Sequence, residues 1–130
     1  MKPKEPQPKF GGDWPTLAAK FGYTIDRHAQ DWPIEVAETY RLQDYLRVYE
    51  QDELSDLART SLMEMILEAT EMKMRDSPKA EEIISVQLIL QRDFAEHSCL
   101  IHKWCDWNND DLSESYDITP LMRTIWQANK

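Results

Sequence analysis

The residue types best suited to chemistry lie close together in the last third of the chain. Residues 92–117 contain both cysteines, two of the three histidines and seven carboxylates. The usual catalytic templates are absent from the sequence, which has no glycine-rich phosphate loop, no Gly-x-Ser-x-Gly turn and no His-Glu-x-x-His helix. No catalytic residue is therefore assigned, and a role other than catalysis is favoured. Three patterns within this stretch still resemble known kinds of site.

The first pattern is an acidic loop between two expected helices. Its oxygen-bearing side chains stand at the first, third, fifth, ninth and twelfth places, the order in which an EF-hand surrounds calcium. Asp111 replaces the usual turn glycine, and the twelfth residue is aspartate instead of glutamate. An acidic surface loop is the favoured interpretation, with a single calcium site as the alternative. The residues are Asp106, Asn108, Asp110, Glu114 and Asp117.

The second pattern is a set of zinc-type ligands at helical spacing, Cys99, His102 and Cys105. Steps of three residues would bring these side chains within about 120° of one another on a helix. Structural zinc sites more often draw ligands from loops or from two elements, and buried cysteine is a common core residue. We therefore expect no metal and no cofactor, and keep these three residues as the zinc candidates.

The third pattern is Arg92-Asp93-x-x-x-His97. An arginine followed by a polar residue and then a histidine is similar to the signature of the HEPN ribonucleases, which are all-helical domains of about this size. The resemblance implies that His97 would transfer a proton and Arg92 would bind charge at an RNA phosphate. On one continuous helix, however, the two side chains would project about 140° apart.

These patterns must be positioned by helices, because glycine is scarce and strand-like alternation is nearly absent. We expect an all-α compact bundle of four or five helices. One would run from Pro33 to about Glu50, and a long one over residues 78–107 would lie at the centre. That long helix carries two apolar stripes, the second including Ile84 and Leu88, which is typical of a helix covered on both sides.

A further helix, opening near Asp52, has a regular apolar stripe and a second group of apolar residues on its other side. This group consists of Met63, Leu67 and Met74. Methionine suits adaptable contacts, so we expect either burial under a neighbouring helix or self-association of two copies through these residues.

Charge is the strongest indication of function. The chain has a net charge of −9. Such a charge repels phosphate backbones and anionic membranes, which argues against DNA and membrane partners. Acid concentrates in residues 31–53 and in the loop. We expect a non-enzymatic acidic binding protein, of the immunity or inhibitor kind, that neutralises a basic protein partner. The candidate contacts are Glu35, Glu38, Asp106, Asp110, Asp111, Glu114 and Asp117.

The first residues and the hydropathy of the chain are used to predict its cellular location. Residues 1–12 are rich in proline and lysine and are expected to form a mobile tail before one domain over residues 13–130. No apolar run is long enough for a membrane span, and the first residues lack the apolar stretch of a secretory signal. We therefore expect a cytoplasmic protein with free thiols.

Overall fold

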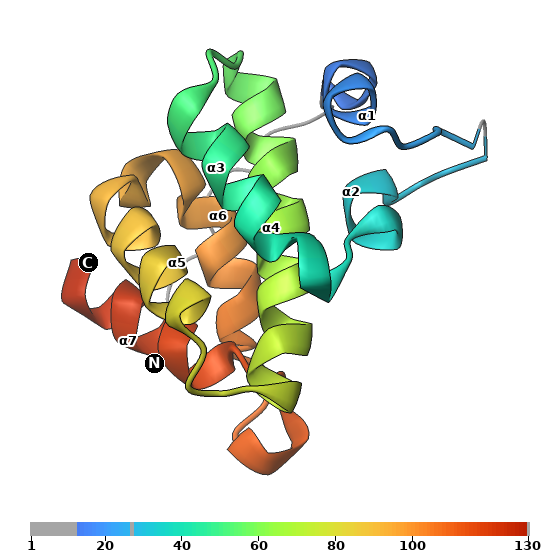
Figure 1. The fold of residues 1–130 in the computed structure, drawn as a ribbon. Coiled ribbons are helices and arrows are strands. Elements are labelled where there is room, and N and C mark those ends of the chain that lie inside the picture. Colours follow the sequence, from blue (N-terminus) through green and yellow to red (C-terminus); the bar gives the residue numbers. More distant parts are fainter. Residues whose placement is uncertain (1–12, 27, 130) are drawn as a thin grey trace. The chain divides into compact units, whose positions relative to one another are not determined.

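The computed structural model describes residues 13–26 and 28–129, which form an all-α fold (Figure 1). These residues contain seven α-helices, two short 3-10 helices and no strand, so the predicted fold class is confirmed. The predicted tail over residues 1–12 lies outside the described part of the chain. The elements are α1 (Trp14–Phe21), α2 (Trp32–Val36), η1 (Thr39–Arg41), α3 (Leu42–Gln51), α4 (Asp56–Asp76), α5 (Glu81–Arg92), α6 (Phe94–Cys105), η2 (Leu112–Glu114) and α7 (Thr119–Asn129).

Contacts between residues divide the chain into two compact units. The boundary falls between Ala69 and Thr70, inside α4. The N-terminal unit contains α1 to α3 and most of α4, and the C-terminal unit contains the end of α4 and α5 to α7. The expectation of one domain over residues 13–130 stays a prediction.

In the N-terminal unit, the repeated Asp-Trp-Pro tripeptide begins α1 and α2. The Asp13 carboxylate accepts a hydrogen bond from the Thr16 amide, and proline occupies the first turn, where its missing N–H is tolerated. Gly22 ends α1 in the left-handed region at φ 73°. The rings of Trp14 and Trp32 stack with their centres 6.0 Å apart, so the two helix starts pack on each other.

The helix expected from Pro33 to Glu50 is interrupted, which corrects that prediction. It consists of α2, a break at Ala37 and Glu38, the short η1 and α3. At the break the Glu38 amide donates to the Tyr45 hydroxyl at 3.0 Å. A side chain from α3 thus satisfies a backbone group that a continuous helix would have satisfied itself.

In the C-terminal unit, the long helix predicted over residues 78–107 is also two helices, α5 and α6. They meet at Asp93, whose backbone (φ −105°, ψ 30°) leaves the helical region. The Asp93 amide still donates to the Ile89 carbonyl, while the Asp93 carbonyl accepts from the Glu96 amide and so begins the next helix. The longest helix is instead α4, with 21 residues.

The second apolar stripe of the predicted long helix is not covered. Ile84 and Leu88, one turn apart on α5, are 59% and 61% exposed. The first stripe is buried, as expected, and includes Val86, Leu90 and Ile101. The apolar side chains of α5 therefore divide between the interior and the surface.

The last helix, α7, packs mainly along α6. The rings of Phe94 and His102, both on α6, lie 5.6 Å and 5.1 Å from the Trp126 ring. The Thr119 hydroxyl, at the start of α7, donates to the Trp104 carbonyl at 2.7 Å. None of the helices in the described residues is long and apolar enough to cross a membrane.

Candidate functional site

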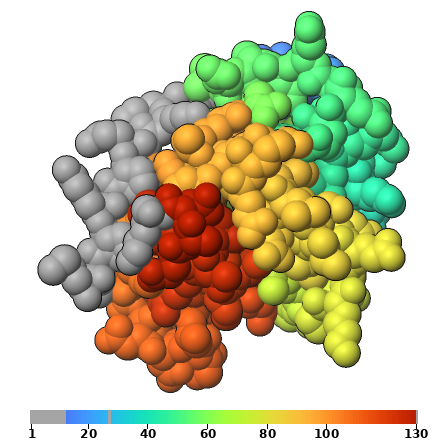
Figure 2. Space-filling model, turned by 90° about the vertical axis from the view of Figure 1, so that its left-hand side faces the viewer, coloured from blue at the N-terminus to red at the C-terminus, as the bar shows by residue number. Residues whose placement is uncertain are grey.

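The acidic loop, residues 106–117, joins α6 to α7 and projects beside α7 as the orange lobe of Figure 2. Its acids Asp110, Asp111 and Glu114 are exposed. Two large apolar side chains stand among them, Leu112 and Tyr116, each 48% exposed. Exposed apolar side chains that stand among charged ones are candidate contacts for a partner.

Arg123 of α7 anchors the first half of this loop. Its guanidinium donates to the carbonyl oxygens of Cys105, Asp106 and Asn109 at 2.7–2.8 Å. The same group lies 5.0 Å from the centre of the Trp107 ring. Because these carbonyls lie at and just beyond the C-terminus of α6, a cation there is favoured both by hydrogen bonding and by the helix dipole.

The second half of the loop is anchored by the end of α4. The Glu71 side chain is buried, and its carboxylate oxygens accept from the amides of Asp117 and Ile118 at 3.1 Å and 2.8 Å. These amides precede α7, where a negative charge stabilises the helix start. Arg75, one turn further along α4, forms an ion pair of 3.1 Å with Asp117.

Within the loop, Asp111 caps the short η2. Its carboxylate accepts from the amide and the hydroxyl of Ser113 at 3.0 Å and 2.7 Å. These hydrogen bonds hold the pKa of Asp111 below its usual value. Asp111 therefore stays charged and fixes the turn that carries Leu112.

The five loop acids named from the sequence thus have different structural environments. Asp110, Asp111 and Glu114 are exposed, Asp117 pairs with Arg75, and Asp106 ends α6 in the left-handed region at φ 51°. Among the described residues, the loop carboxylates do not form a group of three spaced for a metal ion. The calcium alternative therefore gains no support from the geometry.

Glu35 and Glu38, the other predicted contact acids, lie in the N-terminal unit. Glu35 is exposed and lines an open pocket together with Trp32. Glu38 instead accepts hydrogen bonds from the hydroxyls of Tyr23 and Tyr40, at 2.7 Å and 2.9 Å. These two donors lower the pKa of Glu38, and its carboxylate serves the packing of its own unit.

The zinc candidates do not gather into a three-ligand group in the part of the chain that the structure describes. Cys105 is buried, and burial raises the pKa of its thiol to about 12, which disfavours the thiolate that zinc needs. The His102 ring packs edge-on against Trp126. Neither the buried Cys105 thiol nor the His102 ring packed against Trp126 is therefore well placed to bind a metal ion.

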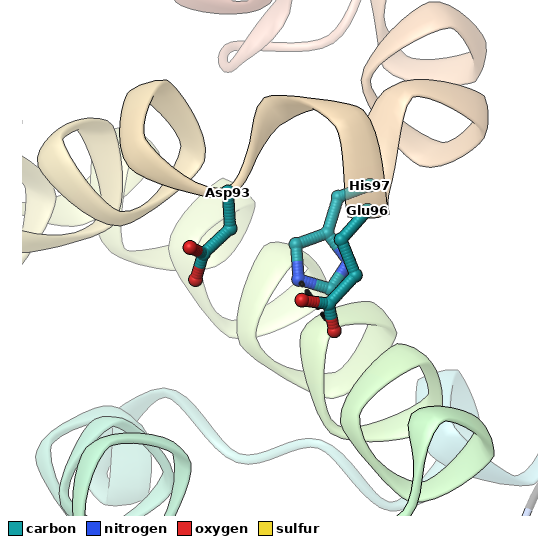
Figure 3. A group of neighbouring side chains, drawn as sticks. All are labelled: Asp93, Glu96 and His97. Carbon is teal, nitrogen blue, oxygen red and sulfur yellow. Dashed lines mark ion pairs between the residues drawn. The ribbon is translucent and has the colours of Figure 1, made fainter.

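The described residues instead gather a different group of metal-type ligands, Asp93, Glu96 and His97, where α5 meets α6 (Figure 3). One ligand atom from each side chain lies within 4.8 Å of the other two. In the sequence, Asp93 and His97 belong to the Arg92 pattern, whereas Glu96 belongs to none of the three patterns described above. The available signal was the spacing of three and four residues, which aligns side chains on one helix face.

The ribonuclease-like pair is not arranged for an RNA phosphate. Arg92 donates two hydrogen bonds to the Asp93 carboxylate, at 3.0 Å and 2.8 Å. The His97 side chain is fully buried. The helix breaks between the two residues, so the predicted separation around one continuous helix does not apply.

The apolar group proposed for self-association is largely internal. Met63 and Leu67 are 0% exposed, and Met74 is half-buried. Burial within the chain, the other expectation, therefore describes Met63 and Leu67. These side chains are not available to a second copy.

No family model matches this chain, and no curated protein or solved structure matches it either.

Proposed function

We propose that this chain is a non-enzymatic binding protein that docks onto a basic protein partner through residues 110–116. The observation that carries the proposal is the combination of exposed Leu112 and Tyr116 with three exposed acids on a loop anchored at both ends. The class of function is that of an immunity or inhibitor protein, in a reducing cytoplasm that suits the two free cysteines.

The apolar side chains would supply most of the affinity. Binding energy in protein interfaces concentrates in a few well-packed anchors, and tyrosine is among the commonest of them. Leu112 and Tyr116 each retain about half of their surface for such packing.

The acids would select the partner and accelerate the encounter. Asp110, Asp111 and Glu114 add local negative charge to a chain whose net charge is already −9. Complementary charge raises association rates and rejects partners of the same sign. A basic protein surface with an apolar depression fits this loop best.

The anchoring contacts favour binding because they fix the loop before a partner arrives. A loop that must be ordered on binding loses affinity through conformational entropy. Arg123 and Glu71 satisfy backbone groups on the two sides of the exposed residues, so this cost is reduced in advance.

The proposal is tested by site-specific photo-crosslinking with a reactive amino acid at position 112, and in a matched protein at position 84. Both positions are exposed and apolar, but Ile84 lies on α5, outside the loop. We expect position 112, and not position 84, to capture a basic protein. That protein, once purified, should bind the unmodified chain and should fail to bind the Tyr116→Ser variant. Equal capture at both positions, or binding unaffected by Tyr116→Ser, would contradict the proposal.

A further inference from the structure

The junction of α5 and α6 places three metal-type ligands on one turn of the chain. Asp93 is the C-cap of α5 and the N-cap of α6, and Glu96 and His97 follow it at three and four residues. Figure 3 shows the side chains of Glu96 and His97 directed to the same side of the first turn of α6. The spacing of three and four residues places Asp93, the N-cap of α6, on the same face of that turn as Glu96 and His97.

The distances and the burial of this group distinguish it from ordinary surface acids. The His97 imidazole Nε2 lies 3.9 Å from Glu96 Oε2, and the three ligand atoms are all within 4.8 Å of one another. The side chains of Asp93 and Glu96 are only 16% and 24% exposed, and that of His97 is fully buried. A histidine and two carboxylates are thus brought together where water has limited access.

We propose that Asp93, Glu96 and His97 form a binding site for a divalent transition metal ion, with zinc as the preferred ion. Zinc accepts imidazole nitrogen and carboxylate oxygen together, whereas calcium and magnesium favour all-oxygen sites. Three protein ligands leave the fourth tetrahedral position to water. Ligand atoms around a tetrahedral zinc ion stand about 3.3–3.4 Å apart, so shifts of the side-chain atoms by up to about 1.5 Å would close the site.

Arg92 acts against metal binding at this site. Its guanidinium donates to both oxygens of Asp93 and places a positive charge beside the ligands. A metal ion must share this carboxylate with Arg92 or displace it. Removal of the Arg92 charge is therefore expected to tighten metal binding, which would not follow if the three residues served packing alone.

The test is isothermal titration of zinc chloride into the full chain after treatment with a chelator. Because His97 is buried and its replacement would disturb the core, the substitutions are made at the half-buried carboxylates Asp93 and Glu96. We expect one zinc ion per chain, with affinity about tenfold or more weaker in Glu96→Gln and in Asp93→Asn. Glu81→Gln, at an exposed carboxylate on α5, is the matched control and should bind as the wild type does. Arg92→Gln should bind several-fold more tightly.

Cobalt substitution separates this site from the cysteines. Cobalt bound by Asp93, Glu96 and His97 shows no sulfur-to-metal charge-transfer absorption, whereas cobalt bound by Cys99 and Cys105 does. Such absorption would overturn the proposal. So would a zinc dissociation constant weaker than about 1 mM in the wild type, or equal affinities in the wild type, Glu96→Gln and Asp93→Asn.

Discussion

At the scale of single residues, the acids in the described part of the chain include two contrasting groups. One group hydrogen bonds within its own unit, as Glu71 does with two loop amides and Glu38 does with two tyrosines. The other group, including Asp110 and Glu114, is exposed. Formal charge alone does not separate the groups, because the difference lies in the donors that the fold brings to each carboxylate.

Glu71 is expected to matter for stability more than any exposed acid of the loop. Glu71→Gln replaces one acceptor oxygen with an NH₂ group that faces a backbone N–H. We expect a loss of about 1–3 kcal/mol of unfolding free energy, measured by urea denaturation. Glu114→Gln, at an exposed acid, should change stability by less than about 0.5 kcal/mol. Equal effects of the two substitutions would show that Glu71 does not anchor the loop.

Glu38 should make stability sensitive to acid. Its pKa in the folded chain lies below the ordinary 4.5, owing to hydrogen bonds from Tyr23 and Tyr40. The resulting stabilisation is complete above pH 4.5 and is lost as the pH falls through the lower folded pKa. The difference in unfolding free energy between wild type and Glu38→Gln should therefore shrink below pH 4.5. Tyr40→Phe, which removes one donor, should move this loss closer to pH 4.5. A difference that does not vary with pH would contradict this account.

At the scale of elements, the helix ends with clear local signals were the predictable ones. Pro15 and Gly22 are such signals at the two ends of α1, where proline occupies the first turn and glycine is the C-cap. The breaks at Glu38 and Asp93 were not predicted, because hydrophobic periodicity continues through each of them. The break at Glu38 depends on a hydrogen bond to Tyr45, seven residues away, and only the folded chain supplies it. Asp93 had a weak signal, since aspartate disfavours helix interiors.

Packing of α6 on α7 should depend strongly on Trp104. This side chain is 6% exposed, lies 4.8 Å from the Tyr116 ring, and its carbonyl accepts from Thr119. Trp104→Ala should cost about 3–5 kcal/mol of unfolding free energy, because a large cavity replaces a buried ring. The melting temperature and the urea midpoint are the measurements. A nearly unchanged melting temperature would show that this helix contact is not part of the core.

At the scale of the whole molecule, the candidate sites were only partly predictable. Composition identified the acidic loop, because charge is visible in the sequence. The anchor Glu71 lies far from the loop in the chain, and both Glu71 and Arg123 act through backbone groups of the loop, which the sequence does not show. The spacing of Glu96 from Asp93 and His97 is visible in the sequence, but the burial and the ligand distances that distinguish this group are seen only in the structure.

The most direct test of the proposed function is the association rate with the purified partner captured at position 112. Asp110→Lys/Asp111→Lys/Glu114→Lys reverses three exposed loop charges. Glu53→Lys/Asp76→Lys/Glu81→Lys makes the same change in net charge at exposed positions outside the loop. The Debye length falls from about 10 Å at 0.1 M salt to about 3 Å at 1 M, so high salt removes steering by the loop.

At 0.1 M salt, the loop variant should associate at least about tenfold more slowly than the wild type. The association rate of the control variant should fall by much less than tenfold. At 1 M salt, the wild-type rate should fall towards that of the loop variant. Equal rates for the wild type and the loop variant at low salt would contradict the claim that this loop binds a basic partner.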